Sequence, residues 1–176
     1  MAMKQALEMF DVLDDAGVNG RLVEELLKSR GIDKTEVITI KGKKGSTDFV
    51  RAIVPGLNGR STGGRSPSLG IVGRLGGIGA RPERIGLVSD GDGAVTALTC
   101  ALKLADMKHK GDDLQGDVII GTHVCPNAPV EPHEPVPFMG SPVEISVMNK
   151  YEIDPKMEAV LSVDTTKGNR IIKFKG

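Results

Sequence analysis

The chain has 176 residues, which is enough for one domain and short for two. Its 23 basic and 23 acidic residues cancel, and it has no block of five or more lysines and arginines, so the charge pattern of a dedicated nucleic-acid-binding protein is missing. Hydrophobic residues make up 39% of the chain but aromatic residues only 3%, which predicts an aliphatic core and argues against a surface for stacking bases.

The cysteine content points to a reducing compartment. The chain has two cysteines, Cys100 and Cys125, without a disulfide-type spacing. It shows no leader of signal-peptide type and no apolar run of about 18 residues. We therefore expect a cytoplasmic protein with no membrane partner, in which Cys100 is a small buried hydrophobe within a helix.

Residues 1–31 predict a pair of helices. Asn19 is a suitable N-cap for the second helix, and Gly31 stands where a left-handed residue ends it. The first helix has an apolar face at helical spacing, formed by Ala6, Met9, Phe10 and Leu13.

Residues 36–176 alternate strand and helix patterns. A helix pattern begins at Asp92, residues 141–157 are weakly helical, and the proline-rich stretch 125–142 predicts an ordered excursion or a lid. Short apolar or β-branched runs predict strands at 36–40, 47–54, 68–73, 85–88, 117–122, 159–164 and 169–174. Together these patterns predict a single α/β domain over residues 1–176, in three layers, with a largely parallel or mixed central sheet and helices on both faces.

Residues suited to chemistry follow four of the predicted strands. Ligands of such sheets bind at the carboxyl ends of the strands, which makes these positions the predicted site. The residues are Arg74, Asp90, Asp164, and the pair His123 and Cys125.

The acidic residues have structural alternatives. Asp90 and Asp164 follow apolar strands within two residues, where a carboxylate can reach water or a metal. Asp92 is explained by capping the helix that it begins. Asp164 also fits an Asx-type turn that closes a hairpin, a role that leaves ligand binding open.

His123 and Cys125 are two residues apart, so in an extended chain their side chains point the same way. Such a pair can bind a soft metal, or act as base and nucleophile.

The glycine cluster that includes Gly76 and Gly77 has the composition of a phosphate-binding loop. However, no lysine follows in the required place, and Pro82 interrupts the chain where the helix should begin. Arg74 and Arg81 can instead bind the carboxylate or phosphate of a small ligand, or lie in a solvated basic loop.

Several long stretches resemble a bacterial family that is catalogued as a domain of unknown function. They include GRLGGIGARPERIGLVSDGDGAVTALTCALKLADM, THVCPNAP and SVDTTKGNR. Members of that family are roughly twice as long, so the resemblance implies that this chain corresponds to their first part. It further implies an incomplete sheet, which a second copy of the chain or a second polypeptide would complete.

The order of the elements is similar to that of the co-catalytic zinc aminopeptidases and carboxypeptidases. This distant resemblance implies that Asp90 and Asp164 hold a divalent metal such as zinc. Arg74 stands in the place of a ligand histidine, and Cys125 in the place of a glutamate pair. An ordinary two-zinc mechanism therefore lacks most of its ligands.

Two functions are compatible with this sequence. The first is a hydrolase of an amino-acid or peptide-like amide, with either a single metal held by Asp90, Asp164 and His123, or Cys125 as nucleophile beside His123. The second is a catalytically inactive zinc-hydrolase scaffold that binds a small ligand or serves in assembly.

Overall fold

A computed structural model describes residues 1–74, 77–78, 87–89, 91–126, 129–132, 134 and 138–164. Gly76, Arg81, Asp90 and the predicted strand 169–174 lie outside these residues. The described helices are α1 (Met3–Asp14), α2 (Gly20–Ser29), α3 (Asp92–His109) and α4 (Ile145–Glu152), with a short 3₁₀ helix at Arg60–Thr62. The described strands are β1 (Lys34–Gly42), β2 (Gly45–Val54), β3 (Leu69–Gly73), β4 (Gly77–Ile78), β5 (Leu87–Ser89), β6 (Val118–Val124), β7 (Val130–Glu131), β8 (Phe138–Met139) and β9 (Ala159–Val163).

The central sheet has five strands in the order β1-β2-β6-β3-β9. β1 and β2 form an antiparallel hairpin, and β2 pairs with β6 in the antiparallel sense. β3 is parallel to both β6 and β9. The structure therefore confirms the α/β class, with a mixed sheet.

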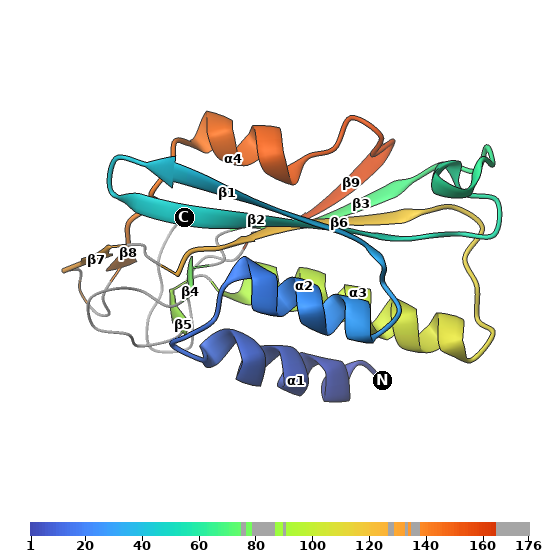
Figure 1. The fold of residues 1–176 in the computed structure, drawn as a ribbon, viewed down its shortest axis with the longest axis horizontal. Helices are drawn as coiled ribbons and strands as arrows, with labels where there is room; N and C mark the ends of the chain where they lie inside the picture. Colours follow the sequence, from blue (N-terminus) through green and yellow to red (C-terminus); the bar gives the residue numbers. More distant parts are fainter. Residues whose placement is uncertain are drawn as a thin grey trace.

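Helices cover both faces of this sheet. Figure 1 shows α4 on one side, α2 and α3 on the other, and α1 farther out beyond α2 and α3. None of the described helices is long and apolar enough to cross a lipid bilayer.

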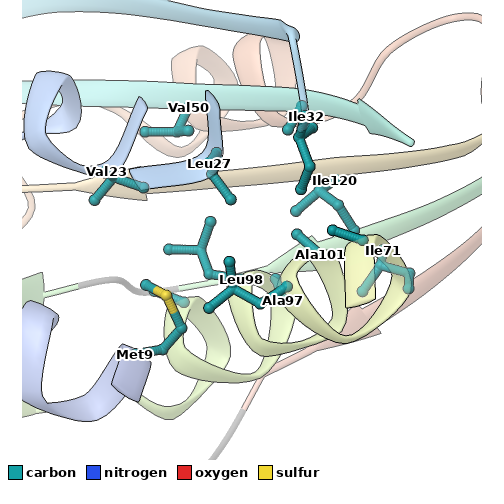
Figure 2. Packing of buried hydrophobic residues seen from close by; sticks show 14 of the residues in the cluster. Met9, Val23, Leu27, Ile32, Val50, Ile71, Ala97, Leu98, Ala101 and Ile120 are labelled. Atoms are coloured by element: carbon teal, nitrogen blue, oxygen red, sulfur yellow. The ribbon is translucent and has the colours of Figure 1, made fainter. Parts of the chain in front are cut away.

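The aliphatic core fills the space between the sheet, α2 and α3. Figure 2 shows Met9 of α1, Leu27 of α2 and Leu98 of α3 pointing into the same layer, opposite Ile120 of β6. All four side chains are fully buried. Small residues on α3, such as Ala97 and Ala101, let this helix approach the sheet closely.

The helix ends follow the sequence signals. Asn19 caps α2 by accepting a hydrogen bond from the Leu22 N–H, and Gly31 adopts the left-handed φ of 79°. The predicted apolar face of α1 is correct for Met9 and Leu13 but wrong for Phe10, which is 48% exposed. The buried position in the first turn of α1 is taken by Gln5.

Two predicted strands differ from the structure. The continuous apolar run at 159–164 is typical of a strand that is buried on both faces, but β9 is an edge of the sheet among the described residues, and its Leu161 is 57% exposed. The run at 85–88 was expected to end beside the parallel strands, but β5 pairs with β4 in a separate two-stranded sheet. An apolar run alone does not reveal which strand pairs on both sides.

Candidate functional site

A polar cluster lies between the sheet and α4. It consists of Thr47 on β2, Arg74 after β3, His123 and Cys125 at the end of β6, and Glu152 at the end of α4, and we call it the Cys125 cluster. Thr47 lies next to Cys125 because β2 and β6 are paired with Asp48 opposite Val124. Alternation along β6 turns Ile120 toward the core and His123 toward the other face, so the cluster is separate from the apolar core.

Short contacts connect the cluster. His123 Nδ1 lies 2.5 Å from Glu152 Oε1, and the Thr47 hydroxyl lies 2.9 Å from the Cys125 sulfur. The Thr47 hydroxyl also donates to the Val124 carbonyl oxygen at 3.2 Å. The Arg74 Nε lies 3.4 Å from Glu152 Oε2. Arg74 thus pairs with Glu152 among the described residues.

The cluster is closed to solvent on most sides. Glu152 is fully buried, and His123 and Cys125 are 3% and 2% exposed. The side chain of Arg74 remains 21% exposed, and its guanidinium also donates a hydrogen bond to Asn149. Arg74 is therefore the cluster member through which a ligand in solvent has the most direct access.

The charges of the cluster determine the state of His123. Burial lowers the pKa of its imidazole, but the neighbouring charges of Cys125 and Glu152, and the hydrogen bonds to both, raise this pKa to about 10. At neutral pH the imidazole therefore carries a positive charge.

Glycine at position 121 lets α4 lie close to the sheet. A Cβ atom there would overlap with the carbonyl oxygen of Glu152. Arg51 holds the same end of the helix, donating to the Tyr151 carbonyl oxygen at 3.1 Å and pairing with Asp154 at 3.2 Å. Phe49 stacks on the Tyr151 ring, with ring centres 5.1 Å apart. These contacts fix the position of the Glu152 carboxylate.

The carboxyl ends of three parallel strands meet beside the cluster. The Arg74 N–H donates to the Val163 carbonyl oxygen at 2.9 Å, so the ends of β3 and β9 are adjacent. Gly93 in the first turn of α3 packs closely against both strand ends. Asp164 follows β9 directly and is exposed. Arg74, Cys125 and Asp164 thus share one edge of the sheet, while Gly77 lies in β4, in a separate two-stranded sheet.

The described residues do not fit a zinc pair. His123 uses its Nδ1 for Glu152, and Asp164 is exposed beyond the end of β9. Among the residues that the structure describes, no group of three or more histidine, cysteine, aspartate and glutamate side chains is arranged to hold a metal ion. A pair of zinc ions needs more ligands than these positions supply.

Sequence reasoning missed Glu152 and Thr47. Glu152 is 29 residues from His123 in the chain and lies in a stretch with only a weak helical pattern. A glutamate near a helix end is most often a solvated residue, so only the packing of α4 reveals its role. Thr47 was missed because a β-branched residue within a predicted strand is ordinarily structural.

Comparison with known proteins gives one family. Residues 38–176 match the family model described as a protein of unknown function, DUF1177. No curated protein matches the chain. The match supports the resemblance to a domain of unknown function and gives no support to the resemblance to zinc exopeptidases.

Proposed function

The chain belongs to the DUF1177 family of unknown function, and from the geometry of its Cys125 cluster we propose that it is a cysteine-dependent hydrolase of an amino-acid or peptide-like amide. The observation that carries the proposal is that His123, whose Nδ1 lies 2.5 Å from Glu152 Oε1, precedes the buried Cys125 by two residues on the same side of the sheet. A nucleophile, a neighbouring proton-transfer group and a carboxylate that orients this group are the parts that covalent acyl transfer requires.

The proposed reaction has two steps. The Cys125 sulfur attacks the carbonyl carbon of the amide as a thiolate, the His123 imidazolium gives its proton to the leaving nitrogen, and the carbon–nitrogen bond breaks to leave a thioester and a neutral His123. Water, deprotonated by the neutral His123, then attacks the thioester, which releases the carboxylic acid and restores the Cys125 thiolate and the His123 imidazolium. Glu152 acts as a positioning residue, because its contact with Nδ1 fixes the orientation of the imidazole.

Arg74 supports the choice of substrate class. Its guanidinium is partly exposed at the strand ends and can pair with a carboxylate of the substrate. Because Cys125 is 2% exposed, a substrate reaches the sulfur only after the surrounding side chains or backbone shift. Small thiol reagents should therefore react with Cys125 faster than bulky ones.

The test measures hydrolysis by two cysteine variants. Cys125→Ser and Cys100→Ser are compared on a panel of dipeptides and amino-acid amides, with Cys100 as the matched control in α3. We expect Cys125→Ser to lose hydrolysis and Cys100→Ser to keep it. Hydrolysis that survives in Cys125→Ser, or a panel on which the unaltered protein shows no activity, contradicts the proposal.

A second candidate function is a non-catalytic scaffold that binds a small anionic ligand. It is favoured by the nearly complete burial of His123 and Cys125, which suits a structural cluster. Ligand binding to the folded state alone raises the melting temperature. A thermal-shift screen of amino acids should then show a hit that Arg74→Gln abolishes, without any hydrolysis.

A further inference from the structure

Helix α1 has a second apolar face, which points away from the core. Met9 and Leu13 are fully buried, whereas Met3, Leu7 and Phe10 are 65%, 58% and 48% exposed. Because these three exposed residues are spaced by four and three positions, their side chains form one row along the helix, which we call the α1 stripe. Figure 1 shows α1 as the outermost helix on its side of the sheet. Large apolar side chains gathered in one exposed row are typical of an interaction surface.

The charged residues of α1 are separated along the helix. Lys4 lies in the first turn, and Asp11 and Asp14 lie near the end. Glu8, between them, pairs with Arg30 of the same chain, and Asp14 accepts a hydrogen bond from the backbone of β5. Lys4 and Asp11 are exposed, and neither forms an ion pair or a side-chain hydrogen bond within the part of the chain that the structure describes. These two opposite charges are therefore available to a second molecule.

Lys4 and Asp11 lie on the same flank of the α1 stripe, because seven residues are almost two full helical turns. When two copies of α1 pack antiparallel about a twofold axis, stripe meets stripe, and Lys4 of each copy lies opposite Asp11 of the other. A parallel arrangement would instead place lysine beside lysine and aspartate beside aspartate. The charges therefore favour a second copy of the chain in the antiparallel orientation.

We propose that the α1 stripe is the contact between two copies of this chain, with their α1 helices antiparallel. The contact covers Met3, Leu7 and Phe10 of both copies and forms the pair between Lys4 and Asp11 twice. Two helices of 12 residues bury less area than a standard interface, so we expect a weak dimer that depends on concentration. This contact goes beyond the proposed hydrolysis and does not depend on it, because α1 and the Cys125 cluster lie on opposite sides of the sheet (Figure 1).

The first test is sedimentation velocity from micromolar to millimolar concentrations of the protein. We expect the mean mass to rise from that of one chain toward that of two. Leu7→Gln removes the central apolar side chain from both copies and should weaken association by about tenfold or more. Leu57→Gln, at a 64% exposed leucine in the loop after β2, is the matched control and should associate normally. A chain that stays monomeric at every concentration, or association that Leu7→Gln leaves unchanged, would overturn the proposal.

Charge reversal tests the antiparallel orientation. Lys4→Glu places two negative charges opposite each other in the dimer, and Asp11→Lys places two positive charges there. Each variant should weaken self-association by about threefold or more, and the weakening should decrease with added salt. A mixture of the two variants should associate more tightly than either alone, because opposite charges then face each other at both positions. A mixture that associates no better than the separate variants would overturn the antiparallel contact.

Discussion

Glu152 and His123 are two ionisable side chains that are buried in contact with each other, with 2.5 Å between Oε1 and Nδ1. Burying an unpaired charge costs several kcal/mol, so each group depends on the other and on Arg74. This interdependence holds α4 on the sheet in either proposed function.

The raised pKa of His123 predicts how stability depends on pH. Because the folded-state pKa is about 10 and the unfolded value is 6.5, the folded protein binds this proton more tightly. The resulting stabilisation is complete below pH 6.5 and is lost as pH rises toward 10. The difference in free energy of unfolding between the unaltered protein and His123→Gln should therefore shrink over this range.

Chemical denaturation at a series of pH values measures this difference. His109→Gln, at an exposed histidine at the end of α3, is the control for replacing a histidine by glutamine outside the Cys125 cluster. Titrating groups that do not interact with His123 cancel in this comparison, because their surroundings are the same in both proteins. A difference for His123→Gln that does not vary with pH would contradict the assigned charge state.

Asp117 organises the loop before β3 and predicts the opposite pH dependence. Burial raises the pKa of its carboxyl, but hydrogen bonds from the Ser61 N–H, the Gly56 N–H and the Ser61 hydroxyl, and the charge of Lys34, lower it below the usual 3.8. These three bonds are 2.7, 3.0 and 2.9 Å long. The carboxylate therefore contributes stability that is present above pH 3.8 and is lost as pH falls below it.

Asp117→Asn should lower the free energy of unfolding by about 1–3 kcal/mol at neutral pH, because the amide cannot accept all three hydrogen bonds. The loss should decrease below pH 3.8. Urea denaturation measures it, and Asp112→Asn, at an exposed position after α3, is the control. Equal stability of the two variants would show that the loop does not need the carboxylate.

At the scale of elements, α4 depends on Gly121 beneath it. A methyl group at this position overlaps with the Glu152 carbonyl oxygen, so α4 must shift. We expect Gly121→Ala to lower the free energy of unfolding by about 1–3 kcal/mol. The shift should also separate Glu152 from His123 and expose Cys125 to iodoacetamide.

Denaturation and the rate of Cys125 alkylation test this prediction. Gly17→Ala is a suitable control, because the nearest atom to an added Cβ is a flexible side-chain oxygen of Asp15 at 3.1 Å. If Gly121→Ala alters neither stability nor alkylation, α4 is not held in the way that the structure indicates.

The elements that the sequence predicted well are those with local signals. Asn19 caps the start of α2 and Gly31 follows its end, as the sequence predicted, because helix capping depends on residues that are close in the chain. The common orientation of His123 and Cys125 also followed from strand alternation. By contrast, the exposure of Leu161 on β9 and the burial of Glu152 depend on which distant elements pack together. No pattern within a few residues carries that information.

At the scale of the whole molecule, the family match covers a shorter part of the chain than the buried core does. The match begins at residue 38, within β1, so α1 and α2 precede it. Yet Met9 and Leu27 of these helices belong to the same buried cluster as Leu98 and Ile120. The packing therefore predicts one cooperative unit that includes the N-terminal helices.

Tyr151 provides a probe of this cooperativity, because it is the only tyrosine and the chain has no tryptophan. It lies in α4, on the opposite face of the sheet from α2. Leu27→Ala removes a fully buried side chain from α2 and should lower the free energy of unfolding by about 2–5 kcal/mol. If the chain is one unit, tyrosine fluorescence and circular dichroism should report the same shifted transition.

The control is Leu22→Ala, at a 46% exposed position of the same helix, which should leave the transition unshifted by both probes. A Leu27→Ala variant whose Tyr151 transition stays in place, while part of the helical signal is lost earlier, would show that α1 and α2 unfold separately from the sheet.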